Sequence, residues 1–348
     1  MIFDKIDIKG FRGIRESHLS GLKQVNLFFG KNNCGKSSVL DALFLISGLS
    51  NPKLPFNINI LRDYRNLRKQ DVVLDFYNLD TNGSILISAQ NGETRTLRIR
   101  LLKTSEVEVD LLSNGNNVSS SQTEDKYGLV LDYTIDEASY SSNITFTSNN
   151  GSLLKQEVHL DGRYDERLLC KYLTPKYDFY ASIVGLVDIL KNKEEQILLD
   201  ALRIIEPRVQ DFVLSENDVL VDIGLAQRIP INMMGDGARK MFALLSAIYE
   251  CAEGVVLIDE ISNGFHHSVM KRMWGALISV AKKRNVQVFA TTHDKDSIIG
   301  LRDAVVMGKS EDIVASFKLQ KLSDDTLKAY SYSFEGLDYS LNQNIELR

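Results

Sequence analysis

The chain has 348 residues, of which 44% are hydrophobic and 25% charged, and its formal net charge is −5. These values are typical of a globular protein with a sizeable core and exclude the disordered and fibrous classes. The acidic balance does not favour nucleic-acid binding by bulk electrostatics, although it leaves a local basic stripe open. The sequence has neither the apolar run of about 18 residues that spans a membrane nor a signal-peptide core, so we expect a cytoplasmic protein without a membrane partner.

Residues 1–50 are predicted to form two antiparallel strand regions, then a phosphate loop and its helix. The loop reads G-K-N-N-C-G-K-S and fits the pattern G-x-x-x-x-G-K-[ST], with a β-prone run before it and helical apolar spacing after it as far as Gly48. Its two glycines let successive N–H groups and the helix N-terminus approach one anion. We expect Lys36 to reach the β- and γ-phosphates and Ser37 to offer its hydroxyl to Mg²⁺. The predicted nucleotide-binding residues of this segment are Gly30, Asn32, Asn33, Cys34, Gly35, Lys36, Ser37 and Ser38.

The middle of the chain divides into two regions by its apolar period. From 72 to 150 the period is two, which predicts a lobe of antiparallel β-hairpins. From 165 to 230 apolar side chains repeat at three and four, which predicts a helical layer in which Pro207 closes a helix. The local expectations are a connector at 51–55, a helix at 61–70, strands at 84–88, 96–100, 107–110 and 129–133, and a polar loop at 113–121.

Residues 232–300 begin with a second glycine-rich segment. Residues 234–240 read M-G-D-G-A-R-K and precede a helical run predicted at 241–252. Glycines at a helix start form an anion site, here Gly235, Asp236 and Gly237, while the alternative is an ordinary turn with Asp236 near the cap. Because the chain already has a phosphate loop, this segment is expected to serve the nucleotide of another subunit.

Two apolar strands in the same region end in groups that suit catalysis. Residues 254–258 are continuously apolar and end in Asp259 and Glu260, as in a parallel strand whose carboxyl end faces a ligand. Asp259 is predicted to hold Mg²⁺ through its water shell, and Glu260 to orient or deprotonate the attacking water. The strand at 285–292 ends at His293, which we expect to contact the γ-phosphate or the water. The alternative is that these groups merely end strands at the surface.

The order of these segments is recognisable. It resembles that of an ABC-type ATPase head of the RecF/SMC class, and most closely the ATPase domain of the OLD (overcoming lysogenization defect) family and related AAA-type ATPases of bacterial phage defence. The resemblance covers nearly the whole chain, 1–348, as a single ATPase domain. The segments that carry it are I-K-G-F-R-G-I, G-K-N-N-C-G-K-S-S, M-G-D-G-A-R-K, V-V-L-I-D-E, S-N-G-F-H-H-S and A-T-T-H-D.

The resemblance implies an α/β fold with a mostly parallel core sheet, an antiparallel β-lobe and a helical subdomain. It also implies a dimer around two ATP molecules, each held by Lys36 and Ser37 of one chain and by the signature at 235–237 of the other. Asp259, Glu260 and His293 then take the Walker B, catalytic-base and switch positions. Arg12, in the F-R-G segment, is expected to approach the nucleotide.

Three departures from the family pattern affect these expectations. The signature lacks the Ser of L-S-G-G-Q, and no Q-loop glutamine can be placed beyond the candidate Gln70. His266 stands where the D-loop usually has Asp, and we interpret it and His267 as interface groups rather than zinc ligands.

The family's nuclease members carry a TOPRIM domain with a Glu and a D-x-D on strand ends. Asp303 and Glu311-Asp312 do not form that pattern, which predicts no intrinsic nuclease.

The sequence therefore predicts an ATPase that uses ATP and Mg²⁺ and forms a homodimer or higher homo-oligomer with nucleotide. By analogy, it regulates a separately encoded effector, for example a nuclease, in bacterial antiphage defence. The first alternative is a DNA-repair-type ATPase of the RecF/SMC kind that clamps DNA. The others are the ATP-driving subunit of a transporter and a nucleotide sensor without turnover.

Overall fold

The computed structural model of the protein describes residues 3–62, 64, 72–102, 125–149, 152–175, 183–215 and 218–342. The strands are β1 (Lys5–Phe11), β2 (Ile14–Ser20), β3 (Val25–Phe29), β4 (Ile85–Asn91), β5 (Glu93–Leu101), β6 (Asp125–Ile135), β7 (Ala138–Asn149), β8 (Ser152–His159), β9 (Cys170–Leu173), β10 (Asp211–Leu214), β11 (Val219–Asp222), β12 (Ile229–Pro230), β13 (Val255–Ile258), β14 (Gln287–Thr292), β15 (Val314–Lys321) and β16 (Thr326–Tyr332). The α-helices are α1 (Lys36–Ser47), α2 (Leu54–Leu61), α4 (Ile183–Lys191), α5 (Glu195–Ile205), α6 (Asp236–Glu250), α7 (Met270–Arg284), α8 (Lys295–Gly308) and α9 (Phe334–Asn342).

One large sheet runs through the molecule. Its 13 strands have the order β8-β7-β6-β5-β4-β1-β2-β16-β15-β3-β14-β13-β9, and a second sheet has the order β10-β11-β12. The strands β15, β3, β14, β13 and β9 pair in parallel, while β2, β1 and β4 to β8 pair antiparallel. The predicted combination of a parallel core and an antiparallel β-lobe is confirmed, and the two parts form one continuous sheet.

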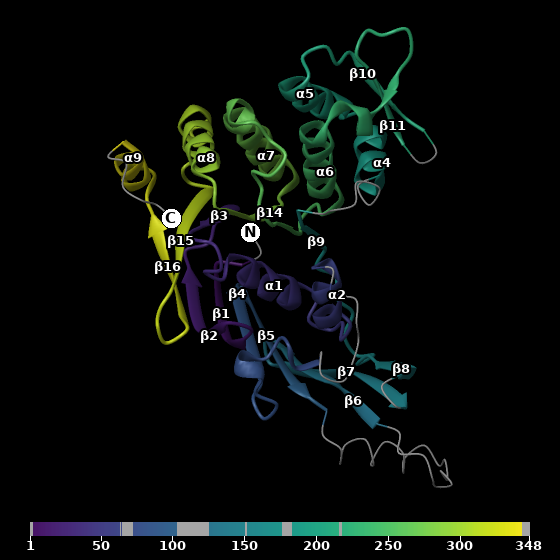
Figure 1. Cartoon of the computed structure of the whole chain (residues 1–348), viewed down its shortest axis with the longest axis vertical. Helices are drawn as coiled ribbons and strands as arrows, with labels where there is room; N and C mark the ends of the chain where they lie inside the picture. Colours follow the sequence, from purple (N-terminus) through teal and green to yellow (C-terminus); the bar gives the residue numbers. More distant parts are fainter. Residues whose placement is uncertain are drawn as a thin grey trace.

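Helices cover both faces of the parallel strands (Figure 1). α6, α7 and α8 lie side by side on one face, and α1 lies on the other, between the parallel and antiparallel parts of the sheet. All four residues of β13 are buried. Val256 and Ile258 pack beneath the α6–α8 layer, and Val255 and Leu257 pack on the side of α1. A strand covered on both faces needs an apolar side chain at every position, which explains the continuous apolar run.

The helix that follows the phosphate loop is buried on most of its circumference. α1 contacts β1, β4 and β5 of the antiparallel part and β9, β13 and β14 of the parallel part. Val39, Leu40 and Leu43 are among its fully buried residues. A helix that is apolar nearly all round is stable only in a core, so the fold holds this helix rigidly below the loop.

Several local predictions are corrected. The connector at 51–55 is shorter than predicted because α2 begins at Leu54, with Pro55 in its first turn. Residues 165–230 contain α4 and α5, with α5 ending two residues before Pro207, but also β9 and the three-stranded sheet. These strands have two to four residues each, too few for a periodic signal.

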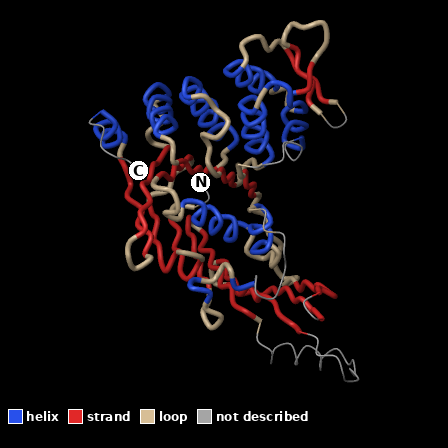
Figure 2. Tube along the Cα trace, in the orientation of Figure 1, coloured by secondary structure: helices blue, strands red, loops and turns tan. Residues whose placement is uncertain are grey.

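Some predictions fall where the structure gives no description. The strand at 107–110, the loop at 113–121 and Gln70 lie outside the described residues, as does most of the helix predicted at 61–70. Figure 2 shows that the helices gather along the parallel strands, while the antiparallel strands extend beyond α1. Within the described ranges, no helix combines the length and the apolar character needed to cross a membrane.

Candidate active site

The phosphate loop joins the end of β3 to the start of α1. Asn33 and Gly35 have left-handed backbone angles, with φ of 61° and 102°, and Gly30 has φ of 150°. The Lys36 amine donates hydrogen bonds to the carbonyl oxygens of Gly30 and Lys31, each at 3.0 Å. The loop therefore folds around the Lys36 amine. A backbone of this shape directs its N–H groups toward an anion.

Lys36 is 5% exposed. Among the described residues, no carboxylate forms an ion pair with it; its bonding partners are the two loop carbonyls. A buried ammonium group without a counter-charge is costly, and a phosphate group would supply that charge. The arrangement suits a phosphate group, and nucleotide binding by this loop stays a prediction.

Two side-chain oxygens from distant parts of the sequence, those of Ser37 and Asp259, lie together. The Ser37 hydroxyl donates to Asp259 Oδ1 at 3.0 Å, so the first turn of α1 meets the end of β13. Thr291 of β14 donates its hydroxyl to the same oxygen at 2.6 Å. Hard oxygen ligands suit Mg²⁺, and Ser37 and Asp259 are the residues that would hold it. Thr291 was not predicted, although a threonine in a fully buried strand is a polar exception that signals a hydrogen-bonding role.

Glu260 and His293 lie together beyond the ends of β13 and β14. His293 Nδ1 is 2.7 Å from Glu260 Oε2, and the two side chains are 47% and 20% exposed. The Glu260 N–H donates to the Thr291 hydroxyl at 2.9 Å. The parallel register of β13 and β14 brings both strand ends to one edge, as the sequence predicted for a ligand site. Their catalytic roles stay predictions.

Arg12 lies in a buried charge cluster beside α1. Its Nε donates to Asp75 Oδ1 at 2.8 Å, its Nη2 donates to Asn59 Oδ1 at 2.9 Å, and Nη1 forms an ion pair with Asp41 of α1. Arg62 donates to the same Asp41 carboxylate at 2.6 Å. In this structure the Arg12 guanidinium is held by its ion pair with Asp41 of α1. Its expected contact with the nucleotide stays a prediction.

The signature segment forms the start of α6. The helix was predicted to begin at residue 241, but it begins at Asp236, so Asp236 and Gly237 lie in its first turn and Gly235 precedes it with φ of 86°. The first turn packs on the loop after β13, since a Cβ added to Gly237 would lie 3.0 Å from the Gly264 carbonyl oxygen. α6 and α1 cover opposite faces of the sheet (Figure 1), and the use of this signature by the nucleotide of another chain stays a prediction.

The two neighbouring histidines begin the short 3-10 helix η5 (His267–Val269). His266 Nδ1 lies 2.9 Å from the Ser268 hydroxyl, and its ring centroid is 4.0 Å from that of His267. Over the described part of the chain, no three His, Cys, Asp or Glu side chains converge to hold a metal ion. The interface role expected for the two histidines stays a prediction.

Known proteins resemble this chain in sequence. The family described as "AAA domain, putative AbiEii toxin, Type IV TA system" matches residues 25–299. A protein of Helicobacter pylori named "ATP/GTP phosphatase" is 25% identical to this chain, and the alignment covers 97% of each. An uncharacterized protein of Methanocaldococcus jannaschii is 33% identical in an alignment of 118 positions that covers 29% of this chain and 53% of that protein.

Among solved structures, the chain is similar to an SMC head bound to the C-terminal winged-helix domain of ScpA. The TM-score is 0.52 at 13% identity, and the alignment covers 96% of this chain and 98% of the SMC head. This likeness establishes the fold as that of an ABC-type ATPase head.

Proposed function

The chain belongs to the AAA domain family described as "AAA domain, putative AbiEii toxin, Type IV TA system", and from this premise we propose that it hydrolyses ATP as a nucleotide-dependent dimer. One observation carries the proposal. A continuous set of hydrogen bonds runs from Ser37 through Asp259 and Thr291 to Glu260 and His293, and so joins the phosphate loop to a carboxylate and an imidazole. The relative named "ATP/GTP phosphatase" aligns over nearly the whole chain and supports turnover.

Each group in this set has a defined task. Lys36 and the N–H groups of the loop bind the β- and γ-phosphates, and Ser37 and Asp259 hold Mg²⁺. The metal, when bound, neutralises charge on the phosphates. Glu260 orients the attacking water and accepts its proton, and His293 fixes the direction of the Glu260 carboxylate.

The proposed dimer is supported by the position of α6 together with the resemblance to ABC-type heads. α6 lies on the face of the sheet opposite α1, and its first turn has backbone N–H groups that can bind an anion. We therefore assign residues 235–237 to the nucleotide of a second copy, in line with the resemblance to ABC-type heads. The chain would then form a homodimer, or a higher homo-oligomer built from such pairs.

The biological role is a further step that rests on the resemblance to OLD-type ATPases. We propose that the dimer acts in the bacterial cytoplasm in antiphage defence and controls an effector encoded separately, for example a nuclease, with no nuclease activity of its own. The competing role is a clamp on DNA. It predicts DNA affinity that falls steeply with salt, which the net charge of −5 does not favour.

The decisive experiment measures mass by light scattering for Glu260→Gln, with and without Mg-ATP. This variant keeps the binding groups and removes the base, so ATP should double its mass or drive a larger closed assembly. Lys36→Ala should abolish ATP binding, whereas the matched control Lys31→Ala, whose side chain is exposed in the same loop, should bind normally. An unchanged mass for Glu260→Gln, or normal ATP affinity for Lys36→Ala, would contradict the proposal.

A further inference from the structure

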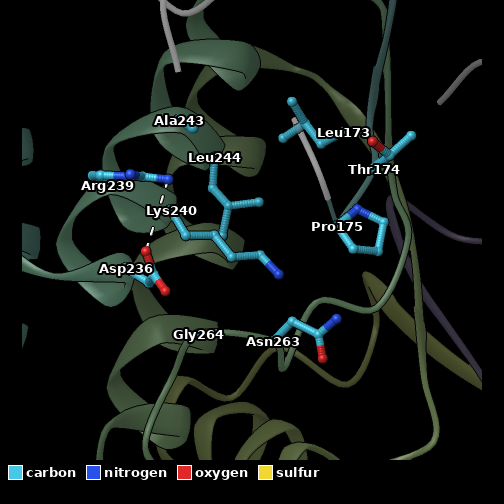
Figure 3. Close-up of a pocket in the computed structure, with 10 residues that line it drawn as sticks. All are labelled: Leu173, Thr174, Pro175, Asp236, Arg239, Lys240, Ala243, Leu244, Asn263 and Gly264. Carbon is cyan, nitrogen blue, oxygen red and sulfur yellow. Dashed lines mark ion pairs between the residues drawn. The ribbon is translucent and has the colours of Figure 1, made fainter. Parts of the chain in front are cut away.

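A lysine of α6 donates a hydrogen bond to the backbone of Glu260, the proposed catalytic base. Lys240 lies one turn into α6, and its amine donates to the Glu260 carbonyl oxygen at 2.8 Å. The same amine lies 5.9 Å from the centre of the Phe265 ring. Figure 3 shows the Lys240 side chain extending along a cavity of about 240 Å³, toward the loop that carries Asn263 and away from Arg239.

Glu260 needs such support because its backbone is strained. Its φ of 53° is left-handed, which costs about 1–2 kcal/mol for a residue with a side chain. The backbone is held on both sides of its Cα: the Glu260 N–H donates to Thr291, and the Glu260 carbonyl, in the next peptide, accepts from the Asn263 N–H at 3.1 Å and from Lys240. Thr291 and Asn263 belong to the strand and loop around the site, whereas Lys240 belongs to α6.

The position of the amine is not the one a packing lysine adopts. Lysines on helices usually bury the aliphatic stem and leave the amine in water. Here the amine turns back to the Glu260 backbone and is partly buried, and this burial lowers the pKa of Lys240 to about 8 despite the carboxylates of Glu260 and Asp259. Arg239, the preceding residue, behaves ordinarily: its side chain is 41% exposed and lies 3.7 Å from Asp236.

We propose that Lys240 is a positioning residue that fixes the Glu260 peptide and couples the first turn of α6 to the catalytic base. The inference rests on the proposed function, because it assigns α6 to the nucleotide of the second copy. A shift of α6 when that nucleotide binds would move the Lys240 amine and so change the direction of the Glu260 carboxylate. The hydrolytic group of one site would in this way sense whether the opposite site is filled.

The test compares Lys240→Met, Lys240→Arg and the control Lys271→Met, whose lysine is exposed on the first turn of α7. Loss of a charged donor to a strained peptide should lower kcat by about 10- to 100-fold, with ATP affinity within about twofold of the parent. Lys240→Arg keeps a cationic donor and should recover most of kcat. Lys271→Met should match the parent in both quantities.

A double-mutant cycle separates positioning from general damage. If Lys240 acts through Glu260, adding Lys240→Met to Glu260→Gln should lower the single-turnover rate by less than about twofold. Full additivity of the two losses, or a Lys240→Met protein with the parent's kcat, would overturn the proposal.

Amide hydrogen exchange gives a readout that does not depend on turnover. Lys240→Met should speed exchange in the loop at 259–265 by about tenfold without nucleotide, while exchange in β14 stays unchanged. If the parent protein fails to hydrolyse ATP, the proposed function is wrong, and the exchange result alone decides whether Lys240 holds this peptide. Unchanged exchange in the loop would refute the contact.

Discussion

Gly30→Ala is the sharpest test of the shape of the phosphate loop. Gly30 has φ of 150°, and a Cβ added there would lie 2.5 Å from the Leu319 carbonyl oxygen and 3.1 Å from Cys34 Sγ. Leu319 belongs to β15, which pairs in parallel with β3, so neither backbone can retreat without disturbing the core sheet. Overpacking costs about 1–3 kcal/mol, and a side chain at a glycine-favouring φ adds about 1–2 kcal/mol. We expect a total strain of about 2–5 kcal/mol.

The assay is urea unfolding with and without Mg-ATP. The strain either lowers the free energy of unfolding or displaces the loop, and a displaced loop should bind ATP at least about tenfold more weakly. Gly21→Ala is the matched control, because Gly21 also has a positive φ, 73°, but an added Cβ there meets no atom within 4 Å. The control should lose about 1 kcal/mol of stability and keep its ATP affinity. A Gly30→Ala protein that unfolds like the control and binds ATP like the parent would refute this account of the loop.

Two further predictions concern groups beside the loop. Asp41→Ala should lower the free energy of unfolding by about 1–3 kcal/mol, because Arg62 loses its buried carboxylate partner and, among the described carboxylates, Arg12 keeps only Asp75. Urea denaturation measures this loss, and a value below about 1 kcal/mol would contradict the structural role of the cluster. Burial raises the pKa of the Cys34 thiol, so at pH 8 it should react with a thiol reagent far more slowly than in urea. Bound Mg-ATP should slow the reaction further, and equal rates with and without nucleotide would place the nucleotide elsewhere.

The sequence was most informative where function depends on a short continuous segment. The loop from Gly30 to Ser37 is specified locally, since its glycines, its lysine and its flanking strand and helix are adjacent in the chain. Asp259 and His293 could be placed because a buried parallel strand reads as an unbroken apolar run. The carboxyl ends of such strands meet at one edge, which is enough to bring these residues together without knowing the full topology.

What the sequence could not reveal depends on contacts between distant segments. Arg12 and Asp41 meet because α1 packs against both the antiparallel and the parallel strands. The spacing of apolar residues in the sequence does not reveal that pairing. The insertion of β15 and β16 between β2 and β3 puts Leu319 against Gly30, although the two residues are far apart in the chain. Lys240 was only the last residue of the glycine-rich segment in the sequence, because its contact with Glu260 is visible only when α6 is packed beside the loop after β13.

The contacts of Glu260 bear on how the two sites of a dimer would communicate. Its N–H donates to Thr291, which donates to Asp259, and Asp259 in turn accepts from Ser37 of the phosphate loop. Its carbonyl, in the next peptide, accepts from Lys240 of α6 and from the Asn263 N–H. The backbone on the two sides of Glu260 is therefore held by different parts of the fold: strand β14 on one side, and α6 with the loop after β13 on the other. We therefore expect the Glu260 carboxylate to be best aligned when both sets of contacts are in place, which would link hydrolysis at one nucleotide to occupancy of the other.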